Sequence, residues 1–218
     1  MANTSPASQC RLEPIILNDE DQFIELQRQR VLCGWDYDPE TIKRWKVKQE
    51  EKLKSLFWIT IPDSSDKDKE LLRTGHISLD ANSSFDPPEL KNFPHVKNCV
   101  FSISSFFILP EYRSYGLGRH AMKMAEDMAV KEPYGSPNCR FIALNALSKR
   151  YIYDEGPDWR GVWERLGVSP PSFSIQEWYE ALGYVSWKEE PLYEEKALNG
   201  DIVKLWEAFM RKEVQRIA

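Results

Sequence analysis

A glycine-containing turn at residues 109–119 is the segment of this chain whose residue types and spacing could do chemistry. Gly116 and Gly118 occupy alternate positions, and Arg113 and Arg119 flank them. Glycines let a backbone approach a bound group closely, and the amide groups and dipole at the start of a helix attract phosphate. The arginines could add positive charge. The segment therefore predicts a cradle for a pyrophosphate group.

The surroundings of this turn strengthen the prediction. A dinucleotide-binding turn needs GxGxxG and a P-loop needs GxxxxGK followed by serine or threonine, and neither pattern is present at the turn. Many ordinary strand-to-helix turns also contain glycine. Here, however, residues 99–109 are rich in β-branched and aromatic residues and end at Pro110, and residues 119–130 have an apolar helical face. A buried strand should therefore lead through the turn into a helix.

The remaining elements predict one mixed sheet with helices. Strands are predicted at residues 11–17, 56–62, 74–79, 99–109, 140–147 and 184–187. Helices are predicted at residues 19–33, 39–53, 119–130 and 174–183, with loops near residues 63–69 and 82–98. Residues 201–214 fit a helix by spacing, but a strand over residues 202–210 competes with it. The fold class is α/β or mixed α+β.

Length and composition favour a single domain over residues 1–218, with a flexible stretch at residues 1–10 and an insertion at residues 148–173. The net charge of -5 argues against a nucleic-acid partner, because nucleic-acid-binding surfaces are normally basic. The longest apolar stretch, residues 100–109, is too short to span a bilayer, and residues 1–9 do not resemble a secretory leader.

The cysteines and histidines indicate neither structural zinc nor a metal-dependent reaction. The four cysteines, Cys10, Cys33, Cys99 and Cys139, are widely spaced and lack neighbouring histidines at zinc-finger intervals. They are expected to be free thiols in a reducing compartment. We therefore expect a soluble cytoplasmic protein, monomeric or homodimeric, that binds no metal, nucleic acid or membrane.

A second segment supports a family resemblance. Residues 178–184 read Trp-Tyr-Glu-Ala-Leu-Gly-Tyr, similar to a Tyr-x-x-x-Gly-Phe segment, and residues 113–118 have the spacing R-x-x-G-x-G. Together these motifs resemble the GCN5-related N-acetyltransferase (GNAT) superfamily over residues 11–187. Two motifs in the family's order are more specific than either one alone. The resemblance implies a GNAT-like domain, a mostly antiparallel twisted sheet splayed at the cofactor site, and acetyl-CoA as cofactor.

The resemblance also implies roles for individual residues. The main chain of residues 106–108 would pair with the pantetheine arm, and residues 114–119 would hold the pyrophosphate. The expected cofactor-binding residues are Phe106, Phe107, Ile108, Arg113, Ser114, Tyr115, Gly116, Leu117, Gly118, Arg119 and Asn145. Tyr179 would protonate the leaving thiolate, which suits a phenol. A buried aromatic residue with a satisfied hydroxyl group is the alternative for Tyr179.

The general base is not evident. An amine must lose a proton before it attacks, yet residues 99–109 contain no acid. Asp80, at the end of a predicted strand, is one candidate and a water relay is the other. Glu111 and His120 fit ordinary surface positions, and the role of His76 stays open.

Two segments, residues 33–37 and residues 148–173, could surround the acceptor. Both combine aromatic residues with acids, and together these can hold an ammonium group. The expected acceptor-binding residues are Trp35, Asp36, Asp80, Tyr153, Asp154 and Trp159. A satellite hydrophobic cluster is the alternative for residues 148–173. The predicted function is transfer of an acetyl group from acetyl-CoA to a primary amine, such as a small cationic molecule. A protein or peptide N-acetyltransferase and a noncatalytic acyl-CoA-binding protein are the alternatives.

Overall fold

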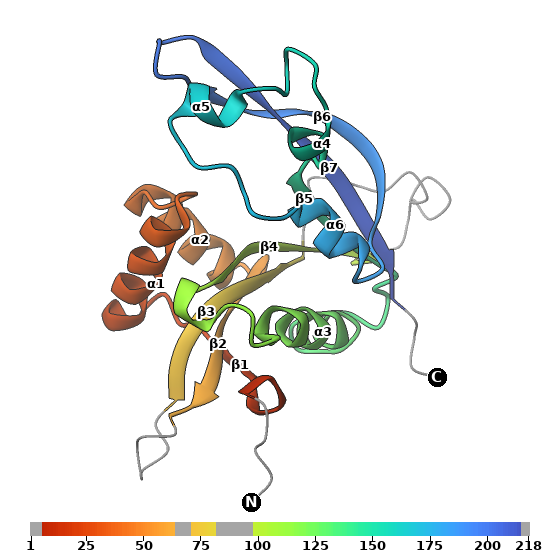
Figure 1. Cartoon of the computed structure of the whole chain (residues 1–218). Coiled ribbons are helices and arrows are strands. Elements are labelled where there is room, and N and C mark those ends of the chain that lie inside the picture. Colours follow the sequence, from red (N-terminus) through yellow and green to blue (C-terminus); the bar gives the residue numbers. More distant parts are fainter. Residues whose placement is uncertain (1–5, 64–70, 82–97, 215–218) are drawn as a thin grey trace, which may run out of the picture. The chain divides into compact units, whose positions relative to one another are not determined.

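The computed structural model describes residues 6–63, 71–81 and 98–214 (Figure 1). These residues form two compact units: residues 6–63, 71–81, 98–142 and 214 in the first, and residues 143–213 in the second. The two loops expected near residues 63–69 and 82–98 lie almost entirely outside the described residues. No helix in the described part of the chain has the length and apolar character needed to cross a membrane.

The strands confirm the predicted mixed, mostly antiparallel sheet. The strands of the described residues are β1 (Arg11–Pro14), β2 (Lys54–Pro62), β3 (Leu71–Asp80), β4 (Val100–Ile108), β5 (Phe141–Leu147), β6 (Val185–Lys196) and β7 (Ile202–Glu213). Their hydrogen-bonded order is β1-β2-β3-β4-β5-β7-β6. The pairs β1–β2, β2–β3, β3–β4 and β6–β7 are antiparallel. The chain passes from the first unit to the second within β5.

The helices begin and end near the predicted positions. They are α1 (Glu20–Cys33), α2 (Pro39–Glu50), α3 (Leu117–Ala129), α4 (Arg150–Tyr153), α5 (Val162–Leu166) and α6 (Ile175–Glu180), with 3-10 turns η1 (Pro6–Gln9) and η3 (Pro110–Tyr112). The turn η1 occupies part of the segment expected to be flexible. The insertion at residues 148–173 contains α4 and α5, which are too short to show a helical periodicity.

Capping residues explain the ends of the first two helices. The Asp19 carboxylate accepts a hydrogen bond from the Gln22 backbone amide (3.1 Å) at the start of α1, which ends at Gly34 with a φ of 85°. The Asp38 carboxylate accepts one from the Thr41 amide (2.8 Å) at the start of α2. These bonds satisfy amide groups that a helix cannot pair internally. The loop at residues 34–38 therefore begins at Gly34, the C-cap of α1, and ends at Asp38, the N-cap of α2.

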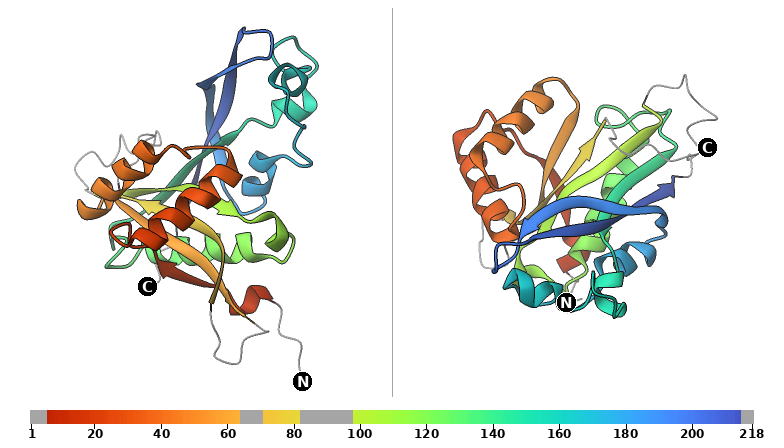
Figure 2. Two further views of the ribbon diagram at one scale, coloured as in Figure 1. Left: turned by 90° about the vertical axis from the view of Figure 1, so that its left-hand side faces the viewer. Right: turned by 90° about the horizontal axis from the view of Figure 1, so that it is seen from above.

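In the first unit, the sheet is covered on both faces, and Figure 2 shows α1 and α2 on one side of its strands and α3 on the other. Alternate residues of β2 point to opposite faces. The buried residues on the α1–α2 side are Ile15, Leu17, Leu26, Ile42, Trp45, Leu56 and Trp58. On the other side, the Phe57 ring packs edge-on against Tyr134, just after α3, with ring centroids 4.8 Å apart. Burying both faces explains why most of β2 is apolar.

The core of the second unit is an aromatic cluster. Its buried members are Tyr151, Trp159, Val162, Ala197, Val203 and Leu205. The Tyr151 hydroxyl group donates to the Lys204 carbonyl (3.0 Å) and accepts from the Trp206 amide (2.9 Å), which ties α4 to β7. Residues 148–173 therefore contain the satellite hydrophobic cluster that was the alternative to a purely functional insertion.

The tail left open between helix and strand is a strand. Val203, Leu205, Glu207 and Phe209 alternate on the buried face of β7, and residues 202–211 pair with β6. Its apolar spacing also fits a helix, so pairing with a distant segment decided the outcome.

Candidate active site

The glycine-containing turn has the geometry of an anion-binding helix start. Gly116 is the N-cap of α3 with a φ of 80°, no side chain caps the helix, and Ser114 also has a positive φ of 67°. The first-turn amide groups of an α-helix have no partner inside the helix. They are therefore available to a bound anion, which the helix dipole also favours. A positive φ strains any residue except glycine, which explains the residue type at 116.

The segment predicted to pair with pantetheine begins at a β-bulge in β4. Phe107 is opposite His76 and Ser104 is opposite Ser78, so two residues of β4, Ser105 and Phe106, face one residue of β3. Ser105 has a φ of 50°. A bulge re-aims the backbone and interrupts pairing, and such irregularities are common beside active sites. Phe107 and Ile108 use one edge of β4 to pair with β3.

The two arginines of the turn differ. The Arg113 side chain folds back onto β4, where its Nε donates to the Ile108 carbonyl (3.1 Å) and its guanidinium lies 5.5 Å from the centroid of the Phe107 ring. Arg119 is exposed on α3, as is Tyr115 in the turn, whereas Leu117 is buried. Both arginines are exposed, and in this conformation the Nε of Arg113 is already engaged by the backbone of β4.

His120 and the cysteines have ordinary surroundings. The His120 Nδ1–H group donates to the Gly116 carbonyl (3.2 Å) on the surface of α3. All four cysteines are free thiols. Within the described residues, no three histidine, cysteine, aspartate or glutamate side chains are grouped so that they could hold a metal ion.

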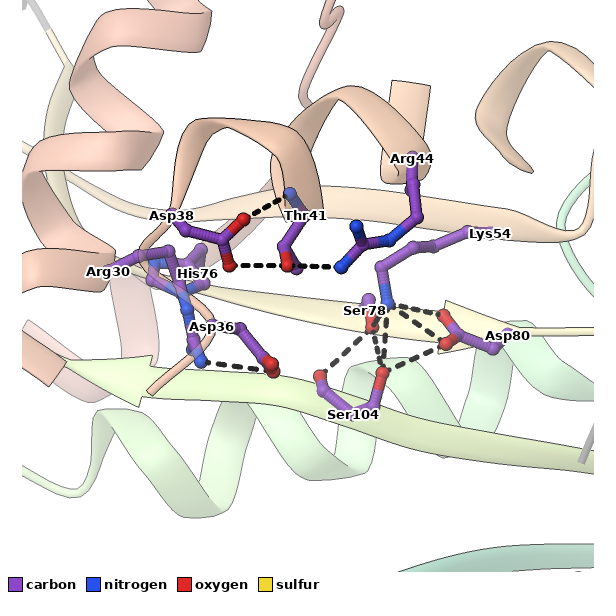
Figure 3. Close-up of polar contacts among 10 residues, drawn as sticks. All are labelled: Arg30, Asp36, Asp38, Thr41, Arg44, Lys54, His76, Ser78, Asp80 and Ser104. Carbon is purple, nitrogen blue, oxygen red and sulfur yellow. Dashed lines mark hydrogen bonds and ion pairs between the residues drawn. The ribbon is translucent and has the colours of Figure 1, made fainter. Parts of the chain in front are cut away.

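Asp80 takes part in a largely buried ion pair of the first unit (Figure 3). The Lys54 ammonium group donates to Asp80 Oδ2 (2.9 Å), Ser78 Oγ (2.9 Å) and Ser104 Oγ (2.9 Å), and Ser104 Oγ donates to Asp80 Oδ2 (2.9 Å). Lys54 Nζ also lies 4.6 Å from the centroid of the Trp45 ring. Burial lowers the pKa of Lys54, and the Asp80 carboxylate opposes that effect. The network joins β2, β3 and β4, which favours a structural role for Asp80.

His76 belongs to a second polar group of the first unit, and Figure 3 draws it together with Arg30. Its Nδ1–H donates to Gln29 Oε1 (2.9 Å), so its Nε2 can accept from Arg30 Nη1 (3.4 Å). Burial, together with the nearby Arg30 and Lys54 cations, holds the pKa of His76 well below its usual range. His76 is therefore neutral and its contacts with Gln29 and Arg30 favour a structural role.

The loop between α1 and α2 presents the two predicted acceptor contacts of the first unit. Asp36 has a φ of 49°, and its carboxylate lies 3.6 Å from Arg30 Nη2 while remaining 59% exposed. Trp35 is 44% exposed. An acid and an aromatic ring thus lie at the surface of one short loop, where an ammonium group could reach both.

In the second unit, α6 holds Tyr179 firmly. Ser174 Oγ accepts a hydrogen bond from the Glu177 amide (3.1 Å) and so caps the helix start, where the predicted helix also begins. At the other end, Gly183 has a φ of 91°, and the Tyr184 amide donates to the Tyr179 carbonyl (3.1 Å). The Tyr179 ring lies edge-on to Tyr184 with centroids 5.8 Å apart. Both ends of the predicted 174–183 helix are thus explained by local capping.

The hydroxyl group of Tyr179 makes no hydrogen bond to another residue in the described part of the chain. The ring is buried. Burial raises the pKa of the phenol, and the nearby Glu207 carboxylate raises it further. The phenol therefore stays protonated, as a general acid must before it acts.

Glu207 is a candidate that sequence reasoning missed. Its side chain is on β7 and only 6% exposed, and its Oε2 accepts a hydrogen bond from Asn145 Nδ2 on β5 (3.2 Å). Burial raises the pKa of Glu207 to about 7, although the Asn145 hydrogen bond opposes that effect. If residues 202–213 are taken as a strand, every second residue faces inward, and Glu207 is an acid between apolar residues on that face. This was the signal available in the sequence.

The three acceptor contacts predicted in the insertion each have a partner within the second unit, and Arg150 contacts two of them, Asp154 and Trp159. The Tyr153 hydroxyl group donates to Glu177 Oε2 (2.6 Å) at the surface, and Arg150 Nε donates to Asp154 Oδ2 (2.6 Å). Trp159 is buried in the aromatic cluster, with the Arg150 guanidinium 4.2 Å from its ring centroid. These contacts favour a structural role for Trp159.

Comparison with known proteins gives the class of fold. No family model and no curated protein matches the sequence. Solved structures do match: a chimera of spermidine N-acetyltransferase SpeG from Vibrio cholerae and hSSAT has 16% identity and a TM-score of 0.54, covering 94% of this chain and 95% of its own.

Two further matches carry coenzymes. Aminoglycoside 6'-N-acetyltransferase complexed with coenzyme A has 13% identity and a TM-score of 0.52, covering 94% of this chain and 97% of its own. Arabidopsis thaliana NAA60 in complex with acetyl-CoA has 11% identity and a TM-score of 0.57, covering 94% of this chain and 98% of its own. At these identities the similarity shows the fold. The chain has the fold of the GNAT acetyltransferases, as its two motifs predicted.

Proposed function

We propose that this chain is an acetyl-CoA-dependent N-acetyltransferase that transfers the acetyl group directly to a primary amine of a small cationic molecule. The observation that carries the proposal is the glycine-containing turn before α3, which has an uncapped helix start and a glycine at positive φ. It occupies the position that the motif predicted, in a chain with the fold of acetyltransferases. Fold alone does not determine chemistry, so the site must supply the argument.

The described residues fit coenzyme A group by group. The first-turn amides of α3 and the exposed Arg119 would hold the pyrophosphate. Residues 106–108 of β4, beside the bulge, would carry the pantetheine arm by backbone hydrogen bonds. Coenzyme A would supply the acetyl thioester. Tyr179, in the second unit, would give its phenolic proton to the departing sulfur.

A cationic amine is favoured as acceptor by the loop between α1 and α2. Asp36 and Trp35 are both exposed there, so an ammonium group could be held by charge and by the ring face. Two of the matched proteins are named as acetyltransferases of spermidine and of an aminoglycoside, which are both small amines. NAA60 is equally similar in fold, so comparison does not choose between acceptor classes.

The cofactor assignment can be tested by isothermal titration calorimetry with acetyl-CoA, comparing the wild type with Gly118→Asp. Position 118 lies in the first turn of α3, where a carboxylate suits the helix dipole, so the variant should fold. The same carboxylate would repel the pyrophosphate and occupy its place. Loss of one charged hydrogen bond is worth about 1.5–3 kcal/mol, so affinity should fall by roughly 10-fold to 100-fold.

Ile24→Asp is a matched control, because it adds the same charge to an exposed position of α1. It should bind acetyl-CoA as the wild type does. Absence of binding by the wild type, or unchanged binding by a folded Gly118→Asp protein, would contradict the proposed cofactor site.

A further inference from the structure

We propose that Glu207 is the general base of the acyl transfer, acting in the same unit as the general acid Tyr179. This inference rests on the proposed function and identifies the group that the motif-bearing strand β4 lacks. Residues 100–108 contain no acid, and Asp80 is engaged by Lys54. Neither β4 nor the end of β3, where the sequence suggested a base, therefore offers an unpaired acid that could act in place of Glu207.

The surroundings of Glu207 are those of a reactive carboxyl group. A buried carboxylate is costly unless it is paired with a cation or well hydrogen-bonded. Among the described residues, its only hydrogen bond is from the neutral amide of Asn145, and no cation forms an ion pair with it. Its neighbours along the same face of β7 are the buried Leu205 and Phe209. A carboxylate in this apolar stripe is not explained by packing.

Burial, rather than a neighbouring charge, places the titration of Glu207 near neutrality. Burial raises the pKa of Tyr179 on α6 and of Tyr151 on α4, and the nearby Glu207 carboxylate raises both further. On β6, Glu190 is directly opposite in register, but its carboxylate is paired with Lys188 Nζ (2.6 Å). Burial raises the pKa of Glu207 to about 7. A base with this pKa is both largely deprotonated and usefully basic at neutral pH.

Each proton in the reaction then has a defined destination. Glu207 accepts one proton from the bound ammonium group, which leaves a neutral amine. The nitrogen attacks the thioester carbonyl carbon, the C–N bond forms, and the C–S bond breaks with its electron pair remaining on sulfur. The Tyr179 phenol protonates that sulfur and regains a proton from the nitrogen, which becomes an amide. Glu207 finally releases its proton to solvent, so the products are the acetylated amine, coenzyme A and one proton.

The test compares wild type, Glu207→Gln and Glu190→Gln in acetyl transfer to two probe amines, spermidine and hydroxylamine, as a function of pH. The glutamine variant keeps the shape and the contact with Asn145 but cannot accept a proton. General-base catalysis contributes about 10²–10⁴-fold, so turnover with spermidine should fall by at least roughly 100-fold. The rise of the wild-type rate with pH, centred near pH 7, should disappear. Glu190→Gln, on the partner strand, should behave as the wild type does.

Hydroxylamine separates a base from a merely structural residue. It is already a neutral nucleophile at neutral pH, so it does not need Glu207. Glu207→Gln should therefore retain most of the wild-type turnover with hydroxylamine, and acetyl-CoA binding should be unchanged. Equal losses with both amines, or an unchanged pH profile, would overturn the role of Glu207 alone. Wild-type protein that binds acetyl-CoA but acetylates neither amine would overturn it as well, whereas absence of acetyl-CoA binding would overturn the proposed function itself.

Discussion

The two largely buried carboxylates of Asp80 and Glu207, one in each unit, lie in opposite surroundings. Asp80 faces the Lys54 ammonium group at 2.9 Å, and two serine hydroxyl groups complete that network. Glu207 has a neutral amide at 3.2 Å and apolar neighbours. An acid with a counter-charge can hold strands together, whereas a buried acid without one, such as Glu207, has a raised pKa and can exchange protons. Whether a buried acid has a cationic partner, rather than its burial alone, therefore decides whether it is a structural residue or a candidate base.

The largest effect is expected from removing the cation of the first unit. Lys54→Met would leave Asp80 without its counter-charge in a largely buried position. Breaking one partner of a buried pair costs about 3–5 kcal/mol, so the free energy of unfolding should fall by that amount in urea denaturation. Lys43→Met is the control, because Lys43 and Glu40 form an exposed pair worth at most about 1 kcal/mol. Similar losses of unfolding free energy in both variants would mean that the Lys54–Asp80 pair stabilises the fold no more than an exposed pair does.

Glu207 should make the stability depend on pH with a definite sign. Its native pKa is raised from 4.5 to about 7, so the native state binds a proton more tightly than the unfolded state does. Its contribution is therefore full below about pH 4.5 and is lost as pH rises through about pH 7, by roughly 3 kcal/mol in total. Glu207→Gln should remove this slope from denaturation curves recorded across that range. A wild-type slope that persists in the variant would assign it to other groups.

Removing both partners of the ion pair should cost less than removing one. In Lys54→Met/Asp80→Leu, no charge is left buried without a partner, and such replacements are often nearly neutral. The double variant should recover at least about 2 kcal/mol of the loss seen in Lys54→Met, measured by the same denaturation. A double variant as unstable as the single one would show that the serine hydroxyl groups, rather than the charge, dominate.

The smallest effect concerns the amide next to Glu207. The Asn145 hydrogen bond favours the ionised carboxylate, so Asn145→Leu should raise the pKa of Glu207 further, by up to about one unit. Carbon-13 NMR titration of the glutamate side chains would record the change. A shift towards lower pH would contradict the assigned cause.

Features that depend on neighbouring residues were predictable from the sequence. Helices begin close to the predicted residues 19, 39 and 174, where Asp19, Asp38 and Ser174 cap them. The glycine turn also lies between a strand and a helix, as predicted. These features involve contacts only a few residues apart, so residue type and spacing contain the required information.

Features that depend on pairing between distant segments were not predictable. Lys54 and Asp80 meet because β2 and β3 pair in one register. Nothing in the sequence marks Lys54 as buried, since lysines are mostly exposed. Glu207 and Asn145 are 62 positions apart, and residues 202–213 satisfy two periodicities. The base was therefore sought on the motif-bearing strand and at Asp80.

The most direct test of the proposed activity is mass spectrometry of the wild-type chain incubated with acetyl-CoA and each of three amines: spermidine, an aminoglycoside and a peptide with a free N-terminus. The account predicts acetylated spermidine or aminoglycoside, with free coenzyme A in equal amount. Acetylation of the peptide alone would contradict the small-molecule acceptor, and release of coenzyme A without any acetylated amine would contradict N-acetyl transfer.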